Sequence, residues 1–326
     1  MTDLPDIQNT KSNHNIYIEN VGITDLQLPI MVMQKDGKFQ QTIANISCYV
    51  DLEPEVKGIS MSRLLEVMHE YTYKPLNSDV IAEISKEIRK RSESKKCKVE
   101  MSFPYFMEKV APLSRKRGYI NHTVKFVCEN DNDNIRITYG VVVVVTSLCP
   151  CSKEISDGGA HNQKCFVEVE YNTDEWVWIE DVILSVEACG SCEIFSILKR
   201  PDEKYITERA YGNPLFVEDI VRNVYAALDN TKGITNFKIS VKSDESIHIH
   251  KAVAIASKCR TSNDFNYQDK DSDGNIIISC ENIGEMKTPS SIRLATDGTI
   301  SIDGVEQGRW RKEVNKDKTN GPWGDH

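Results

Sequence analysis

Apolar and polar residues alternate along several stretches of the chain, and this period of two predicts β-strands. Within residues 40–52, for example, Ile43, Ile46, Cys48 and Val50 lie among polar partners. The predicted strands are residues 40–52, 124–128 with an upstream extension, 135–146, 165–171, 237–241 and 247–256. The turn-forming run Asp131-Asn132-Asp133-Asn134 predicts a tight connection between the second and third of these strands.

Other stretches repeat their apolar residues with the period of an α-helix. They are residues 61–71, 78–91, 179–188 and 217–228. In the second of them Val80, Ile81, Ile84 and Ile88 share one stripe, and charged residues cover the remaining surface. The order strand, two helices and two strands occurs twice, which predicts a duplicated unit in an α+β fold. The valine-rich strand at the junction suits a sheet that continues through both halves.

These elements divide the chain into an N-terminal segment, two units and an appendage. Residues 1–25 are polar and rich in asparagine, so we interpret them as a tail or an ordered arm. The first unit is expected over residues 26–147. The second unit, which contains a candidate metal loop, is expected over residues 148–260.

The appendage, residues 261–326, is rich in Asp, Asn, Ser and Gly. Short strands are expected at residues 276–279 and 299–302, with disorder toward residues 316–326. Residues 269–275 imitate the start of a calcium loop, but Cys280 occupies the position of the closing glutamate. We therefore interpret them as an acidic turn.

Composition and charge narrow the class of protein. The 326 residues are 40% hydrophobic and their formal net charge is −9, which argues against a general nucleic-acid surface. The longest apolar run, residues 141–145, is far shorter than the roughly 18 residues of a membrane span. The N-terminus lacks the basic and apolar regions of a signal peptide. These features indicate a cytoplasmic enzyme whose ten cysteines are buried thiols or metal ligands rather than disulfides.

The densest candidate site begins where the valine-rich strand ends. Cys149 and Cys151 stand two residues apart there, and His161 follows after a glycine-containing loop. Thiolate and imidazole are good ligands for zinc and similar divalent metals, so this spacing indicates a metal site. The alternative is a pair of inert thiols at the end of a strand.

A second thiol pair offers a different metal site. Cys189 and Cys192 have the Cys-x-x-Cys spacing that is common around structural zinc, and with Cys149 and Cys151 they would form a non-catalytic four-cysteine centre. The first pair lacks the usual knuckle spacing, however, and 37 residues separate the pairs. This reading is therefore the weaker one.

Two polar clusters complete the candidates. The run Lys199-Arg200-Pro201-Asp202-Glu203-Lys204-Tyr205 is either a solvated turn or a carboxylate flanked by cations suited to phosphates. The run from Asp244 to His250 is predicted to enter a strand, with His248 and His250 on one face. Two imidazoles beside an acidic pair indicate metal binding or acid–base chemistry.

Taken together, these segments resemble the prokaryotic type IB, metal-flexible GTP cyclohydrolase family. The matching stretches, in the order of the family, are Leu4-Pro5-Asp6, Lys57-Gly58, Met61-Ser62-Arg63, Ala111-Pro112-Leu113-Ser114, the loop of residues 149–163, residues 198–208, Phe216-Val217-Glu218-Asp219 and residues 245–250. The runs 147–154 and 198–204 are the most specific. Ser60 departs from the family, which usually has a histidine there, and residues 261–326 are not covered.

The resemblance implies a tunnelling fold, in which tandem units of antiparallel sheet and two helices form a barrel that is completed by oligomerisation, with a homotetramer expected. It also implies conversion of GTP and water to 7,8-dihydroneopterin triphosphate and formate, the first step of pterin and folate synthesis. No nucleic acid and no membrane is expected as a partner. The alternatives are a tunnelling-fold enzyme that acts on another purine or pterin, and a structural metal-binding protein.

The resemblance also assigns roles to individual residues. Cys149, His161 and Glu203 match residues around the metal, and His248 belongs to the same centre as a ligand or as a proton shuttle. Glu218 matches the glutamate that anchors guanine, while Glu245 and Cys151 lie near the substrate. The candidate cations for the triphosphate are Lys199, Arg200, Lys153 and Arg63. A divalent metal, Zn²⁺, Mn²⁺ or Fe²⁺, would activate the water that attacks guanine C8.

Overall fold

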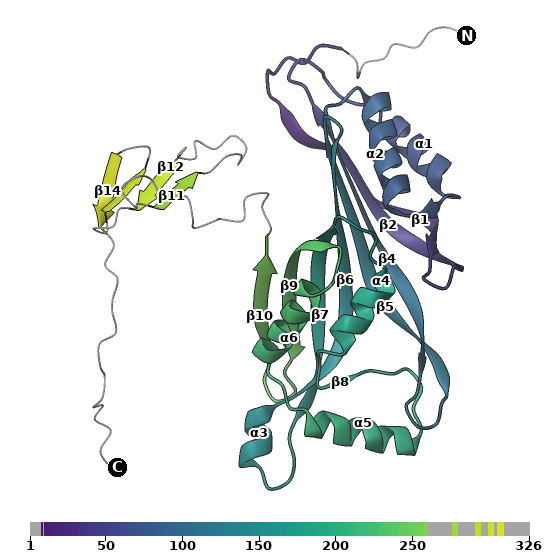
Figure 1. The fold of residues 1–326 in the computed structure, drawn as a ribbon. Coiled ribbons are helices and arrows are strands. Elements are labelled where there is room, and N and C mark those ends of the chain that lie inside the picture. The colour runs from purple at the N-terminus through teal and green to yellow at the C-terminus, as the bar shows by residue number, and fades with distance from the viewer. Residues whose placement is uncertain are drawn as a thin grey trace. The chain divides into compact units, whose positions relative to one another are not determined.

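The structure is a computed structural model that describes residue 8, residues 10–259 and the backbone of four short strands between residues 276 and 309 (Figure 1). The chain separates into two compact units, Met1–Cys259 and Arg260–His326. The four strands of the second unit form an antiparallel sheet in the order β11 (Ile276–Ser279), β12 (Ser291–Leu294), β13 (Thr299–Ile302) and β14 (Val305–Arg309). Both strands expected there, at 276–279 and 299–302, are confirmed.

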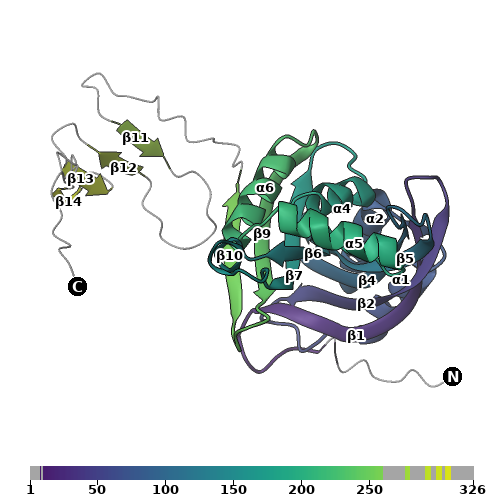
Figure 2. The same cartoon turned by 90° about the horizontal axis from the view of Figure 1, so that it is seen from below.

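The first unit is built on one large sheet. Its strands are β1 (Ile18–Met33), β2 (Phe39–Leu52), β3 (Pro75–Leu76), β4 (Lys96–Val110), β5 (Arg117–Asp131), β6 (Asn134–Leu148), β7 (Asn162–Thr173), β8 (Cys192–Glu193), β9 (Ile234–Asp244) and β10 (Lys251–Lys258). They follow the order β10-β9-β7-β6-β5-β4-β2-β1-β3, and β8 pairs with β6. All long neighbours are antiparallel, so one sheet runs through both halves of the unit (Figure 2).

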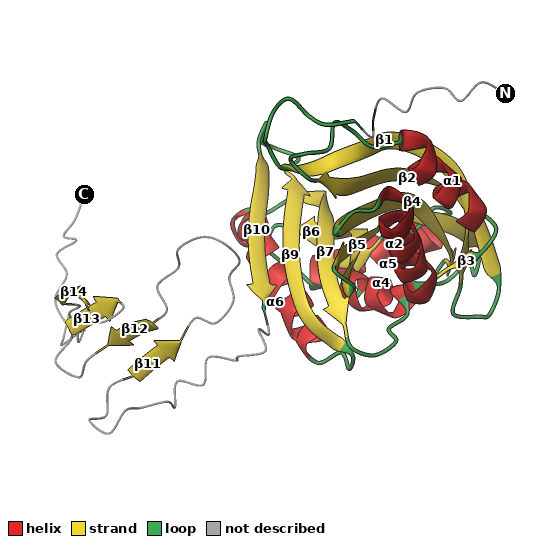
Figure 3. Cartoon of the chain, turned by 90° about the horizontal axis from the view of Figure 1, so that it is seen from above, coloured by secondary structure: helices red, strands yellow, loops and turns green. Residues whose placement is uncertain are grey.

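Six helices accompany this sheet. They are α1 (Met61–Tyr71), α2 (Ser78–Ser92), α3 (Pro150–Ile155), α4 (Ile179–Glu187), α5 (Arg200–Gly212) and α6 (Val217–Asp229). The sheet curves round α1, α2 and α4 (Figure 3). The sheet and these helices meet in one hydrophobic core, which includes the predicted stripe residues Ile81, Ile84 and Ile88. No helix among the described residues is long and apolar enough to cross a membrane.

The element order repeats. The first repeat consists of β1, β2, α1, α2, β4 and β5, and the second of β6, β7, α4, α6, β9 and β10. A two-residue turn joins them, in which Asn132 and Asp133 adopt positive φ angles of 49° and 70°. Asparagine and aspartate tolerate this left-handed conformation best among residues with a side chain. A division of the unit at residue 147 stays a prediction, because the chain to Cys259 forms one compact body.

Two of the long strands are missing from the sequence prediction. Strand β1 begins at Ile18, inside the segment interpreted as a tail or arm, and its first half is mostly exposed. This first half is held mainly by backbone pairing with β2, whereas Leu28, Ile30 and Val32 of the second half belong to the hydrophobic core. Strand β4 did carry a readable signal, because Cys97, Val99 and Met101 alternate with polar residues and are buried.

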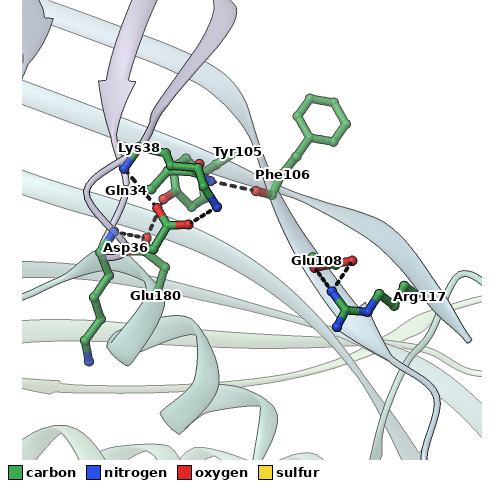
Figure 4. Close-up of polar contacts among 9 residues, drawn as sticks. Gln34, Asp36, Lys38, Tyr105, Phe106, Glu108, Arg117 and Glu180 are labelled. Atoms are coloured by element: carbon green, nitrogen blue, oxygen red, sulfur yellow. Dashed lines mark hydrogen bonds and ion pairs between the residues drawn. The ribbon is translucent and has the colours of Figure 1, made fainter. Parts of the chain in front are cut away.

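The two repeats are tied together at the start of α4 (Figure 4). One oxygen of Glu180 on α4 accepts hydrogen bonds from the hydroxyl of Tyr105 on β4 and from the backbone N–H of Lys35, both at 2.7 Å. The turn that carries Lys35 joins β1 to β2, so this carboxylate of the second repeat holds two elements of the first. Such charge-assisted bonds are stronger than neutral ones.

Candidate active site

Five of the eleven predicted site residues converge on one cavity of about 230 Å³ in the second repeat. Its lining residues are Ser147, Cys149, His161, Gln163, Leu215, Phe216, Val217, Glu218, Glu245, His248 and Ala252. A larger cavity of about 360 Å³ between the repeats has aromatic walls that include Trp176 and Trp178, but no predicted site residue lines it. The smaller cavity is the candidate active site because five titratable side chains meet there.

Strand pairing explains how residues that are distant in the sequence meet in this cavity. In the register of β6 and β7, Ser147 lies opposite Gln163, and the backbone N–H of Cys149 donates to the carbonyl of His161 at 3.1 Å. The pairing of β7 with β9, extended by two residues, brings Gln163 opposite Glu245. Adjacent antiparallel strands thus place Cys149, His161 and Glu245 at one end of the sheet.

Cys149 marks the point where β6 ends and the short helix α3 begins. Pro150 occupies the first turn, where its missing N–H costs no helical hydrogen bond. The Cys149 sulfur accepts a hydrogen bond from the backbone N–H of Ser152 at 3.4 Å, and the side chain is half-buried. The thiol is therefore fixed in place at the wall of the cavity.

His161 is held at three points. Its backbone N–H donates to the Ser152 hydroxyl at 3.2 Å, its carbonyl accepts from Cys149, and its Nδ1 lies 2.7 Å from the Gln163 side-chain oxygen. The amide nitrogen of Gln163 continues to Glu245 at 3.4 Å. Gln163 and Ser152 are functional candidates that the sequence analysis did not single out, because single polar residues next to a motif carry no distinctive signal.

His248 lines the cavity, but the predicted strand arrangement around it is wrong. Strand β10 starts at Lys251, which pairs with Asp244, so the residues between them form the hairpin connection. The rings of His248 and His250 stack with their centroids 4.9 Å apart, and Ile249 is fully exposed. The alternation in this run suggested a half-buried strand, whereas the strand register leaves these residues unpaired.

Glu218 stands in the first turn of α6 and projects into the cavity lining. The helix begins after Phe216, whose backbone N–H donates to the Asp219 carboxylate at 3.0 Å. The preceding residues are held to β6, because the Ser147 hydroxyl donates to the Leu215 carbonyl at 2.8 Å. The carboxylate of Glu218 therefore stands beside an apolar wall made by residues 215–217.

The charged run at residues 199–205 is neither a simple turn nor part of the cavity. It forms the start of α5, with Lys199 preceding the helix and Glu203 in its first turn. The next residues that line the cavity, beginning at Leu215, follow the C-terminal end of this helix. Gly212, the last residue of the helix, is about 14 Å along the helix axis from Glu203. The structure of one chain therefore does not bring Glu203, Lys199 and Arg200 to Cys149.

The remaining predicted residues also lie outside the cavity lining. Cys151 is exposed on α3, and the Lys153 ammonium donates to the Tyr211 carbonyl at 2.5 Å. Arg63 on α1 donates to the Arg91 carbonyl at 2.9 Å in the first repeat. These contacts leave the candidate cations for a triphosphate dispersed over the surface of one chain.

The four-cysteine zinc site is not formed. Cys189 donates its S–H to the Ser185 carbonyl, Cys192 contacts Glu193, and burial raises the pKa of both thiols to about 11. Within residues 10–259, no group of three or more His, Cys, Asp or Glu side chains is gathered at ligating distance. In the cavity, one thiol, two imidazoles and two carboxylates are the donor types that suit a divalent transition metal.

Asp202 is a further residue whose importance only the structure reveals. It is fully buried, and its carboxylate accepts from the backbone N–H groups of Leu113 and Ser114 at 2.8 Å and of Lys199 at 2.9 Å. Burial alone would raise its pKa, but the hydrogen bonds from Ser114, Lys199 and Leu113 hold the pKa well below its usual value. The carboxylate fixes the start of α5 against the β4–β5 connection.

Known proteins match most of the chain. A family model described as type I GTP cyclohydrolase folE2 matches residues 4–254. The chain is 42% identical over 262 residues to the GTP cyclohydrolase FolE2 of Fervidobacterium nodosum, covering 80% of this chain and 98% of that protein. It is 44% identical over 252 residues to the GTP cyclohydrolase FolE2 of Desulfosudis oleivorans, covering 77% and 96%.

Solved structures are similar in fold. A hyper-thermostable AgUricase mutant aligns with a TM-score of 0.50 at 10% identity, over 75% of this chain and 93% of that chain. Uricase from Arthrobacter globiformis aligns with a TM-score of 0.48 at 10% identity, over 74% and 93%. The first likeness, together with the repeated sheet and helix pairs, confirms the predicted tunnelling fold. From the extent and the identity of the sequence matches, the chain belongs to the type I GTP cyclohydrolase FolE2 family.

Proposed function

We propose that this chain is a GTP cyclohydrolase that converts GTP and water to 7,8-dihydroneopterin triphosphate and formate, the first step of pterin and folate synthesis. The observation that carries the proposal is the shared cavity of Cys149, His161, His248 and Glu218. It combines ligands for a metal, a group for proton transfer and a carboxylate for the base. The GTP cyclohydrolase relatives, which match nearly their whole length, support the same activity.

Glu218 is the residue that we propose to bind the guanine base. An ionised carboxylate accepts two hydrogen bonds, which matches two N–H donors on one edge of guanine. The apolar wall of residues 215–217 beside it offers a surface for the flat face of the ring. Glu218 therefore fixes the orientation of the base, and with it the position of C8.

Cys149 and His161 are the proposed metal ligands, with His248 as a third ligand or as the proton shuttle. A bound divalent metal would supply the Lewis acidity that lowers the pKa of water from ~15.7 toward ~7. His248 can accept a proton from the attacking water and return it to the ring nitrogen that leaves as the first C8–N bond breaks. A second water then releases C8 from the resulting formamide as formate, and closure of the pterin ring gives one water back, so that one water is consumed overall. The mixed donor set suits Zn²⁺, Mn²⁺ or Fe²⁺.

A homotetramer is the proposed assembly. Strand β10 is an edge strand of the sheet, and Val253 and Ile255 on it are 56% and 62% exposed. The cavity borders this edge through Ala252, so another copy can extend the sheet next to the site. Glu203, Lys199 and Arg200 would then act at a site through a neighbouring copy or after a movement of α5.

The activity is tested by incubating purified protein with GTP and each divalent metal and measuring the fluorescence of the oxidised pterin product. We expect product with at least one of Zn²⁺, Mn²⁺ and Fe²⁺, and a loss of about 10³-fold or more in Cys149→Ala, equivalent to about 4 kcal/mol of transition-state stabilisation. Cys128→Ala is the matched control, because this thiol is buried in the first repeat. It should lower the melting temperature and keep turnover.

Two outcomes would overturn the proposal. Absence of product with every metal would exclude GTP cyclohydrolase activity. A different product from another purine or pterin would keep the tunnelling fold and the base-binding role of Glu218 while replacing the substrate.

A further inference from the structure

Gln163 lies between the two walls of the active-site cavity. It is the second residue of β7, its side chain is only 8% exposed, and it faces His161 on one side and Glu245 on the other. A buried primary amide has to satisfy both of its ends, because an unmade hydrogen bond in such a position costs about 1–3 kcal/mol. The carbonyl oxygen and the NH₂ group of Gln163 therefore have to match the hydrogen-bonding groups of His161 and Glu245.

The chemistry of the three groups fixes the direction of every bond. An ionised carboxylate can only accept hydrogen bonds, so Glu245 requires the NH₂ end of the Gln163 amide. The carbonyl oxygen of Gln163 then faces His161 Nδ1, at 2.7 Å, and this oxygen can only accept. His161 Nδ1 must therefore carry the hydrogen, and in a neutral imidazole the lone pair is left on Nε2.

We propose that Gln163 is a positioning residue that holds His161 in its Nδ1–H form and thereby presents the Nε2 lone pair to the active-site cavity. The proposal rests on the proposed function in one respect only, that a divalent metal takes this lone pair. Metal-ligating histidines commonly donate their second ring N–H to a carboxylate or carbonyl oxygen, which fixes the tautomer and the ring orientation. Here a side-chain amide fills that role.

The same amide couples His161 to Glu245. These residues come from different connections, His161 from the one between β6 and β7 and Glu245 from the one between β9 and β10. The Gln163 nitrogen reaches the Glu245 oxygen at 3.4 Å, so one side chain sets the spacing between the metal-binding wall and the wall that carries His248. Loss of the amide is expected to affect both the imidazole and this second wall.

Two substitutions separate the two bonds. Gln163→Leu removes both, whereas Gln163→Glu keeps an oxygen that can accept from Nδ1–H but loses the donor to Glu245. Asn172→Leu is the matched control, because this amide lies on the same strand and bonds to the Ile137 carbonyl at 2.8 Å and to Thr138 at 2.9 Å, away from the cavity lining. It should lower the melting temperature and leave metal affinity unchanged.

The first measurement is the tautomer of His161 in the metal-free full chain, read from two-bond ¹H–¹⁵N correlations of ¹⁵N-histidine-labelled protein. The His161 signals are assigned by their loss in His161→Asn. We expect the Nδ1–H pattern in the wild-type protein and in Gln163→Glu, and a mixture of the two forms in Gln163→Leu. An Nε2–H pattern in the wild-type protein would overturn the proposal.

The second measurement is the affinity for Zn²⁺ and Mn²⁺ by competition with a chelator. Gln163→Leu should bind 10–100-fold more weakly, and Gln163→Glu should lose less affinity than Gln163→Leu, because its carboxylate oxygen still accepts from Nδ1–H. Equal affinity of wild type and Gln163→Leu, or an equal loss in both variants, would contradict the role. If the tautomer and affinities are as expected but GTP is not turned over, only the proposed function fails.

Discussion

The two repeats of the first unit have the same element order and differ in their connections. In the first repeat a short turn joins β1 to β2, and the two-residue strand β3 lies between α1 and α2. In the second repeat α3 is inserted between β6 and β7, and β8 and α5 are inserted between α4 and α6. The repeated order provides the sheet and the core, whereas the insertions occur only in the repeat that contains the candidate active site.

The insertions explain why the candidate active site lies in only one repeat. Cys149 and His161 are the two ends of the connection that contains α3, and the residues that follow α5 form the apolar wall and lead to Glu218. The equivalent positions of the first repeat have no comparable loops. A duplicated scaffold can thus keep one copy for stability while the other copy acquires a site, because loops change at little cost to the core.

The largest effect expected beyond Cys149 concerns the hairpin connection of the second repeat. Removing the imidazole in His248→Ala should lower turnover by roughly 10²–10⁴-fold, because this side chain lines the cavity and is proposed to move a proton. His250→Ala is the control, since its ring stacks on His248 without lining the cavity. Equal losses of kcat in both variants would show that turnover depends on the conformation of the hairpin connection rather than on the His248 imidazole alone.

A smaller effect is expected where the two repeats offer matched positions. Glu218 is the second residue of α6 in the second repeat, and Asp79 is the second residue of α2 in the first. Glu218→Gln should raise KM for GTP by roughly 10–100-fold, the loss of a charged hydrogen bond worth about 1.5–3 kcal/mol. Asp79→Asn should leave KM unchanged. A raised KM in both variants would mean that the first repeat also contributes to substrate binding.

The Asp202→Asn variant tests whether the first repeat stabilises the inserted helix α5 of the second repeat. Asp202→Asn removes the charge that binds the backbone of Leu113, Ser114 and Lys199, so the melting temperature should fall at neutral pH. The folded-state pKa is depressed, so the wild-type contribution is present above the usual carboxyl pKa of 3.8 and is lost as the pH falls below it. The difference between variant and wild type should therefore shrink below pH 3.8. A constant difference across this range would exclude the ionised carboxylate as the cause.

The smallest expected effect concerns the tie between the repeats. Tyr105→Phe removes the hydrogen bond to Glu180, which keeps its bond to Lys35, so the free energy of unfolding should fall by about 1 kcal/mol with turnover unchanged. Tyr119→Phe is the control, because this ring is 68% exposed. Chemical denaturation measures both variants. A loss of turnover in Tyr105→Phe would indicate that the contact between the repeats also shapes the active site.

Periodicity alone predicted the elements that have a clear apolar face. The helices at Met61–Tyr71 and Val217–Asp229 and the strands at Phe39–Leu52 and Asn134–Leu148 lie within one or two residues of the prediction. Strand β1 and helix α5 escaped it, because β1 is exposed over its first half and α5 buries only Asp202 and Ala210. Elements that are stabilised mainly by backbone pairing or capping leave little hydrophobic pattern.

The sequence by itself determined the family, the residue types of the candidate site and the core faces of the helices, because motifs and periodicity are local properties of the chain. Only the tertiary structure decided which of these residues meet. Strand register placed Gln163 between His161 and Glu245, and the length of α5 separated Glu203 from Cys149 within one chain. Distances between segments depend on which strands pair and on the direction of each helix, and the spacing of residues within a motif determines neither.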